Sequence, residues 1–188
     1  MRRLQKILIA LGANLETGEF TLAQTVRAAS QALITDEICV VAMSRLFASP
    51  CFPAGAGPDY VNAAAILETT LTPQALLAHL HGVEARFRRE RQNRWGRRTL
   101  DLDLLAYGDL VLPDLATQTE WRNLPPNEQP LKTPQTLILP HPRIQDRAFV
   151  LVPLADIAPD WPHPVLGQTV AQMLGQLDPA DIRAVTPL

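Results

Sequence analysis

The chain has 188 residues, of which 47% are apolar, so it is long enough for one domain with its own hydrophobic core. Charged residues make up 19% and the formal net charge is -2, which excludes an acidic disordered protein and gives no overall positive field for nucleic acid. No apolar run reaches the roughly 20 residues that cross a bilayer, and Cys39 and Cys51 lack the spacing of a metal site. The sequence therefore predicts a single cytoplasmic domain, residues 1–188, with reduced cysteines and no membrane association.

Hydrophobic patterning predicts alternating strands and helices in the first half of the chain. Three strands separated by helical or turn-forming residues are expected at 4–11, 37–47 and 60–70. One helix is expected from Phe20 to Leu33, and another begins at Thr72-Pro73 and ends near residue 90. A fourth strand at 100–107 completes the order β-α-β-β-α-β. This order predicts an α+β fold, a ferredoxin-like sandwich with its helices on one face of the sheet.

The rest of the sequence predicts additional C-terminal helices and short strands. Residues 113–136 contain five prolines and are interpreted as an irregular, proline-rich insertion with little core of its own. After a short apolar run, helices are expected at 147–157 and 170–174, and a last strand at 182–185.

The segment from Arg86 to Asp103 carries the strongest chemical signal. Seven of its first thirteen residues are arginine, and the strand that follows places Asp101 and Asp103 on one face and leucines on the other. Arginine offers phosphate oxygens a planar fork of donors. Carboxylates about 7 Å apart along a strand can hold one or two Mg²⁺ ions together with phosphate oxygens. The joint pattern favours an enzyme that acts on nucleotide phosphates.

Each half of this pattern also has a simpler explanation. Arginine accounts for 15 of the 17 basic residues, a bias that a GC-rich genome produces without any function. The two aspartates can line the solvent face of an amphipathic strand. Aspartate is nevertheless unfavourable in strands, and its position beside a dense arginine run favours the functional interpretation.

Several common nucleotide-binding and catalytic motifs do not occur in the sequence. There is no G-x-x-x-x-G-K-[ST] loop, no G-x-G-x-x-G fingerprint after the first strand and no protein-kinase signature. A serine nucleophile motif and a Cys/His cluster are also missing. If phosphate is bound, arginine side chains must replace the backbone amides of a glycine-rich loop.

Residues 94–105, with the sequence RWGRRTLDLDLL, resemble the signature of the 6-hydroxymethyl-7,8-dihydropterin pyrophosphokinase family of folate biosynthesis. Four further blocks resemble this family in the same order along the chain, at 9–15, 58–64, 139–143 and 147–151. The resemblance implies a diphosphokinase that transfers pyrophosphate from ATP to the hydroxymethyl group of the pterin and releases AMP.

The resemblance also implies catalytic and nucleotide-binding roles. Asp101 and Asp103 would bind two Mg²⁺ ions that bridge the ATP phosphates, and Arg89 and Arg98 would neutralise the transferring group. The residues expected to bind ATP are Arg89, Arg91, Arg94, Arg98, His141 and Arg147. The chain departs from the family pattern at Arg88 and Arg97, where glycine and proline are common, and at Ala13, where serine is common.

A second set of residues is implied for the pterin. Tyr60 and Phe149 would stack on the two faces of the ring, and Asn62 would supply both a donor and an acceptor to its edge. The residues expected to close around the ring are Ser49, Pro50, Cys51, Phe52 and Trp95.

Two other functions are compatible with the sequence. A ferredoxin-like module could bind nucleic acid through the arginine run, although Asp101 and Asp103 would repel a phosphate backbone. A catalytically silent paralogue could serve as a scaffold. The favoured interpretation remains a monomeric enzyme whose partners are ATP and the pterin, with no nucleic acid.

Overall fold

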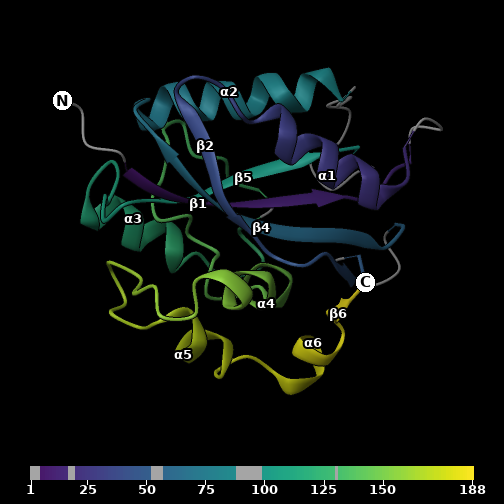
Figure 1. The fold of residues 1–188 in the computed structure, drawn as a ribbon. Helices are drawn as coiled ribbons and strands as arrows, with labels where there is room; N and C mark the ends of the chain where they lie inside the picture. The colour runs from purple at the N-terminus through teal and green to yellow at the C-terminus, as the bar shows by residue number, and fades with distance from the viewer. Residues whose placement is uncertain (1–4, 17–19, 52–56, 88–98, 130) are drawn as a thin grey trace.

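The computed structural model describes residues 5–16, 20–51, 57–87, 99–129 and 131–188, and the structural statements below concern these residues (Figure 1). Within them, six strands form one antiparallel sheet in the order β5-β1-β4-β3-β6, and β2 also pairs with β4. The strands are β1 (Gln5–Ala13), β2 (Ile38–Met43), β3 (Phe47–Ser49), β4 (Tyr60–Thr69), β5 (Asp101–Tyr107) and β6 (Thr186–Pro187). The helices are α1 (Leu22–Ala32), α2 (Pro73–Arg86), α3 (Leu115–Arg122), α4 (Ala148–Ile157), α5 (Val170–Leu174) and α6 (Pro179–Arg183).

Helices α1 and α2 cover one face of the sheet, and their starting points follow from local chemistry. The hydroxyl of Thr21 accepts the backbone N–H of Gln24, whose side chain in turn accepts the N–H of Thr21, so α1 begins with a capping box. At the start of α2, the Thr72 hydroxyl accepts the backbone N–H of Ala75, and Pro73 occupies the first turn. The predicted helix start at Thr72-Pro73 is therefore confirmed, and Thr21 is the residue that caps the helix predicted from Phe20 to Leu33.

The core between these helices and the sheet uses alternate residues of each strand. Ile7, Ile9 and Leu11 of β1 pack there with Leu102 and Leu104 of β5 and with the buried faces of the two helices. Side chains of successive strand residues point to opposite faces, so the remaining residues of β1 and β5 face the other way.

The helices of the βαββαβ unit cover one face as expected, and the additional C-terminal helices α4 and α5 cover the second face (Figure 1). Val150, Leu151 and Leu154 of α4 pack with Leu8 of β1 and Leu105 of β5. The apolar residues on the second face of the strands need such a cover, and the C-terminal part of the chain supplies it.

The predicted long strand 37–47 is interrupted, giving β2 and β3. At the interruption, the Ser44 hydroxyl accepts the backbone N–H of Ala64 at 2.9 Å and donates to the carbonyl of Arg45 at 2.7 Å. The Arg45 guanidinium then donates to both carboxylate oxygens of Asp156 on α4, at 2.9 and 2.7 Å. A side-chain hydroxyl that takes over a ladder hydrogen bond offers the backbone an alternative to continuous pairing, so the strand ends and resumes.

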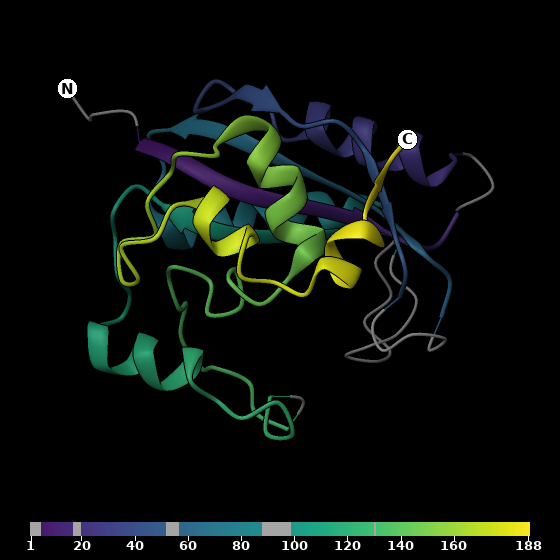
Figure 2. The same cartoon turned by 90° about the horizontal axis from the view of Figure 1, so that it is seen from below.

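Two expectations for the second half of the chain need correction. The insertion 113–136 is not wholly irregular, because Asp114 caps the eight-residue helix α3, whose single buried residue is Gln118. Figure 2 shows α3 standing away from the sheet. The predicted strand 182–185 is wrong, because Asp178 and Pro179 start α6 there and the short strand β6 follows it.

Glu84 of α2 generates a prediction about the edge strand β5. This carboxylate is 1% exposed and accepts the backbone N–H of Leu102 at 2.9 Å. Glu84→Ala leaves that buried N–H unpaired, so we expect the free energy of unfolding in urea to fall by about 1–3 kcal/mol. Glu84→Gln retains an acceptor and should lose less; an equal loss in both variants would contradict this role.

Candidate functional site

A row of three residues crosses the sheet at one end of its second face. Gly12 of β1 pairs with Asn62 of β4 on one side and with Asp101 of β5 on the other. Side chains that pair across antiparallel strands lie on the same face, so the Asn62 amide and the Asp101 carboxylate share the surface around Gly12.

Gly12 is the floor of this surface, and its lack of a side chain matters. A Cβ atom at this position would lie 3.2 Å from Oδ1 of Asn62 and 3.7 Å from Cδ1 of Tyr60. The side chains of Asn62 and Tyr60 therefore lean over Gly12. The predicted first strand ends at residue 11, but β1 continues through Gly12 to Ala13, and this extension brings the floor into the sheet.

Asp101 and Asp103 occupy the face predicted from their alternation. Both side chains are half-buried, whereas Leu102 and Leu104 between and beyond them are in the core beneath α1 and α2. Asp103 pairs with Ala10 of β1, two residues along each strand from the pair of Asp101 with Gly12. The two carboxylates thus line the same side of the edge strand.

The donor set at this edge fits a magnesium ion that is shared with phosphate. The described residues contain no group of three or more histidine, cysteine, aspartate or glutamate side chains that could enclose a metal. Mg²⁺ does not need such a cage, because it is commonly held by one or two carboxylates, phosphate oxygens and water. Asp101 and Asp103 supply this type of partial site.

On the opposite side of Gly12, the Asn62 amide is held by a neighbouring strand. Its Nδ2 donates to the Ser49 hydroxyl at 2.7 Å, and both side chains are about 5% exposed. Tyr60 pairs with Ser49 in the same register and is half-buried. Beyond Ser49, Pro50 is exposed and Cys51 is buried.

Phe149 approaches this region from α4. It packs in a small apolar cluster with Phe47, which pairs directly with Asn62. The guanidinium carbon of Arg147 lies 5.6 Å from the centre of the Phe149 ring, within the range of a cation–π contact. The structure thus brings Phe149 to the side of the sheet that carries Asn62 and Tyr60.

His141 lies beside the carboxylate strand. Its backbone N–H donates to the carbonyl of Leu105 at 2.7 Å, and its Nδ1 accepts the backbone N–H of Arg143 at 3.1 Å. Burial lowers the pKa of His141 to about 3, with smaller contributions from the positive charges of Arg147 and Arg143, while Asp101 opposes the shift. The ring is therefore neutral at physiological pH and lies within electrostatic reach of Arg147 and Asp101.

Several predicted site residues lie outside the described residues. They are Phe52, Arg89, Arg91, Arg94, Trp95 and Arg98, together with the unusual Arg88 and Arg97. Phe52 belongs to the segment 52–56, whereas the arginines and Trp95 belong to the segment between Phe87, which follows α2, and Thr99, two residues before Asp101. Arg86, to which the sequence assigned no role, is the last residue of α2.

Two residues of the region received no role in the sequence analysis. Gly12 lies just beyond the predicted end of the first strand at residue 11, although the apolar alternation of Leu11 and Ala13 indicates a continuing strand. Arg143 is 8% exposed, which is unusual for a cation, and its partners lie about twenty residues earlier in the chain. No local sequence pattern identifies these partners of Arg143.

Comparison with known families identifies one match that covers most of the chain. Residues 8–159 match the model of 7,8-dihydro-6-hydroxymethylpterin-pyrophosphokinase. A Synechocystis protein named 2-amino-4-hydroxy-6-hydroxymethyldihydropteridine pyrophosphokinase is 41% identical over 130 residues, which are 69% of this chain and 56% of that protein. A protein of the same name from Methylorubrum extorquens is 35% identical over 177 residues, which are 94% of this chain and 96% of that protein.

Solved structures show the same fold at low sequence identity. The crystal structure of Plasmodium falciparum HPPK-DHPS with pteroate superposes with a TM-score of 0.65 at 12% identity. The match covers 93% of this chain and 43% of that one, so the chain corresponds to less than half of the Plasmodium protein.

The displaced pKa of His141 predicts a pH dependence of stability. Below its ordinary value of 6.5 the unfolded chain binds a proton at His141 that the folded chain does not bind until near pH 3. The contribution of His141 to the free energy of unfolding is fully present above pH 6.5 and decreases as the pH falls toward 3. Between pH 6.5 and 5, the wild type should lose about 1.5 kcal/mol more unfolding free energy than His141→Gln. Equal pH slopes in urea denaturation of the two proteins would contradict a neutral His141 ring in the folded state.

Proposed function

The chain belongs to the 7,8-dihydro-6-hydroxymethylpterin-pyrophosphokinase family, and we propose that its candidate site transfers pyrophosphate from ATP to 6-hydroxymethyl-7,8-dihydropterin in folate biosynthesis. The products are AMP and the pterin diphosphate. One observation carries the assignment to this site: Asn62, Gly12 and Asp101 are paired across three adjacent strands. A pterin edge held by Asn62 and phosphates held near Asp101 would lie about two strand spacings, or roughly 10 Å, apart.

The architecture supports a finer description of the fold. Helices α1 and α2 connect the strands in the order expected of a ferredoxin-like βαββαβ unit if β2 and β3 are counted as one interrupted strand. The chain is then one domain, in which residues 113–136 are an insertion between β5 and the segment that carries His141. The exposed position of α3 is consistent with an inserted segment.

The nucleotide side of the site is assigned to the carboxylate edge. Asp101 and Asp103 would hold two Mg²⁺ ions, which would supply charge neutralisation at the ATP phosphates. The side chains assigned to the nucleotide are Arg89, Arg91, Arg94, Arg98, His141 and Arg147. Arg89 and Arg98 neutralise the negative charge of the pyrophosphoryl group during transfer. The position of their segment directly before Asp101 in the sequence supports this role.

The pterin side is assigned to the opposite end of the same row. Tyr60 and Phe149 stack on the ring, and Asn62, already oriented by Ser49, hydrogen-bonds its edge. Gly12 leaves room for the ring because no Cβ rises from the floor. Ser49, Pro50, Cys51, Phe52 and Trp95 complete the enclosure.

The reaction requires alignment more than strong acid–base chemistry. The pterin hydroxyl oxygen attacks the β-phosphorus of ATP, the bond from that phosphorus to the oxygen bridging the α- and β-phosphates breaks, and AMP leaves with that oxygen. The hydroxyl proton passes to solvent. His141, neutral with its proton on Nε2, donates a hydrogen bond to the nucleotide and does not take up a proton at neutral pH.

Further properties are proposed with this activity. The protein acts as a monomer in the cytoplasm and does not bind nucleic acid. In the part of the chain that the structure describes, no helix combines the length and the apolar character that crossing a bilayer requires.

The product of ATP turnover tests the proposed function. With ATP, Mg²⁺ and the hydroxymethyl-dihydropterin, the protein should form AMP and the pterin diphosphate in equal amounts, measured by chromatography and phosphorus NMR. Formation of ADP and a pterin monophosphate would contradict pyrophosphate transfer.

Substitution of the two site carboxylates tests their role in the same assay, with a third aspartate as the control. Asp101→Asn and Asp103→Asn should each lower kcat/KM by at least about a hundredfold, because the phosphate charge loses an ion ligand. Asp109→Asn, an exposed carboxylate beyond the end of β5, should retain wild-type turnover. Full activity of Asp103→Asn would mean that Asp103 is an ordinary solvent-facing strand residue with no role in metal binding.

The two sides of the site should separate in binding experiments. Phe149→Ala removes one stacking face, so the pterin Kd from isothermal titration should rise more than about tenfold. The Kd of a non-hydrolysable ATP analogue should change less than twofold in the same variant. Equal losses for both ligands would mean that Phe149 acts through the core around Phe47 and that the pterin assignment is wrong.

A further inference from the structure

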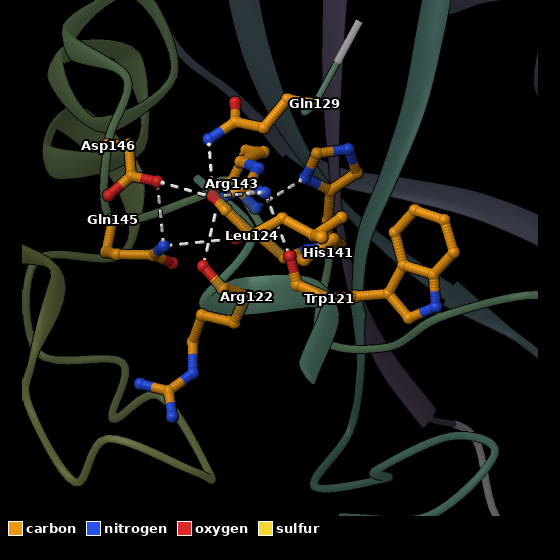
Figure 3. Close-up of polar contacts among 9 residues, drawn as sticks. Trp121, Arg122, Leu124, Gln129, His141, Arg143, Gln145 and Asp146 are labelled. Atoms are coloured by element: carbon orange, nitrogen blue, oxygen red, sulfur yellow. Dashed lines mark hydrogen bonds and ion pairs between the residues drawn. The ribbon is translucent and has the colours of Figure 1, made fainter. Parts of the chain in front are cut away.

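Arg143 is a buried cation that links the insertion 113–136 to the turn that carries His141. Its guanidinium donates to the carbonyls of Arg122 and Trp121 at 2.9 Å each and to that of Leu124 at 3.4 Å (Figure 3). A longer ion pair of 3.5 Å joins it to Asp146. Trp121 and Arg122 are the last two residues of α3 and Leu124 follows it; the last carbonyls of a helix have no i+4 partner within the helix. A cation is electrostatically favoured there.

A second contact ties α3 to the same segment from the other side of His141. Gln118, which is fully buried, donates from Nε2 to the carbonyl of Pro140 at 3.2 Å. Helix α3 is therefore attached immediately before His141 through Gln118 and two residues after it through Arg143. Both attachments are polar, and no apolar side chain of α3 is buried.

The backbone of Arg143 also determines the state of the imidazole. Its N–H donates to Nδ1 of His141, and the N–H of Ile144 donates to the carbonyl of His141 at 3.3 Å. A neutral imidazole that accepts at Nδ1 carries its hydrogen on Nε2. The turn 141–144 thus presents a single donor, Nε2–H, in one orientation.

We propose that Arg143 is a positioning residue: by holding the C-terminal end of α3 it fixes the turn that orients His141, so that the insertion 113–136 controls nucleotide binding. The inference rests on the nucleotide role of His141 in the proposed function. Helix α3 adds little to the core. In this proposal its function is to hold the chain on both sides of His141 through the hydrogen bonds of Gln118 and Arg143.

The test uses Arg143→Met, which keeps the aliphatic stem and the backbone N–H but removes the guanidinium. The Kd of a non-hydrolysable ATP analogue with Mg²⁺ should rise about tenfold, the lower end of the effect that loss of an orienting partner has at metal-binding histidines. The pterin Kd should stay within twofold of the wild type. Arg143→Lys can replace only part of the fork and should show an intermediate value. Arg27→Met, the same change at an exposed position of α1, should match the wild type.

Nitrogen-15 NMR of the His141 ring gives a readout that does not depend on activity. The wild type should show the Nε2–H tautomer alone, and Arg143→Met should show a mixture of tautomers while its circular dichroism remains native. A folded Arg143→Met variant with an unchanged ATP-analogue Kd and a single Nε2–H tautomer would overturn the inference. If this variant does not fold, Gln118→Met removes the other attachment, and the same criteria apply to it.

Failure of this inference is distinguishable from failure of the proposed function. A wild-type protein that forms no AMP contradicts the function itself. Wild-type turnover together with unaltered nucleotide binding in the folded variant overturns only the positioning role of Arg143.

Discussion

The register of β1 against its two neighbours is the constraint on which the site depends. Gly12 must face Asn62 and Asp101 at once, because the three residues contribute the floor, the amide and the first carboxylate of one surface. A shift of one residue in either ladder would turn that strand's functional side chains toward α1 and α2. The apolar residues that alternate with them, Leu11 and Leu102 among them, oppose such a shift because they would leave the core. The core and the site therefore specify the same register from opposite faces.

The second face of the sheet is divided between packing and chemistry. Leu8, Ile66 and Leu105 lie beneath α4 and α5 and form a second apolar core. Farther along the same strands, Gly12, Asn62 and Asp101 carry the polar surface. The N-terminal end of α4 lies at the boundary, with Ala148 and Phe149 packed beside Phe47. One sheet face thus serves as a core at one end and carries the proposed binding surface at the other.

The sequence predicts the local parts of this arrangement well. Alternation places Asp101 and Asp103 on one face, and the pair Thr72-Pro73 locates the start of α2. It does not predict the interruption at Ser44, which depends on Ala64 and on Asp156 of α4. These partners are 20 and 111 residues away, so no window of sequence contains them. The start of α6 was missed for a different reason: Ile182 and Val185 resemble a short strand, but Asp178 and Pro179 start a helix before them.

The floor at Gly12 has a consequence for how this surface can change during evolution. A floor made of main chain presents the same peptide groups whatever residue the gene encodes, and only added bulk can alter it. Any larger residue would press first on Asn62 and Tyr60, the side chains assigned to the natural substrate. An inhibitor that lay flat over Gly12 would therefore contact a position where escape by substitution also harms the enzyme, whereas one that reached mainly the exposed Pro50 would leave more room for resistance.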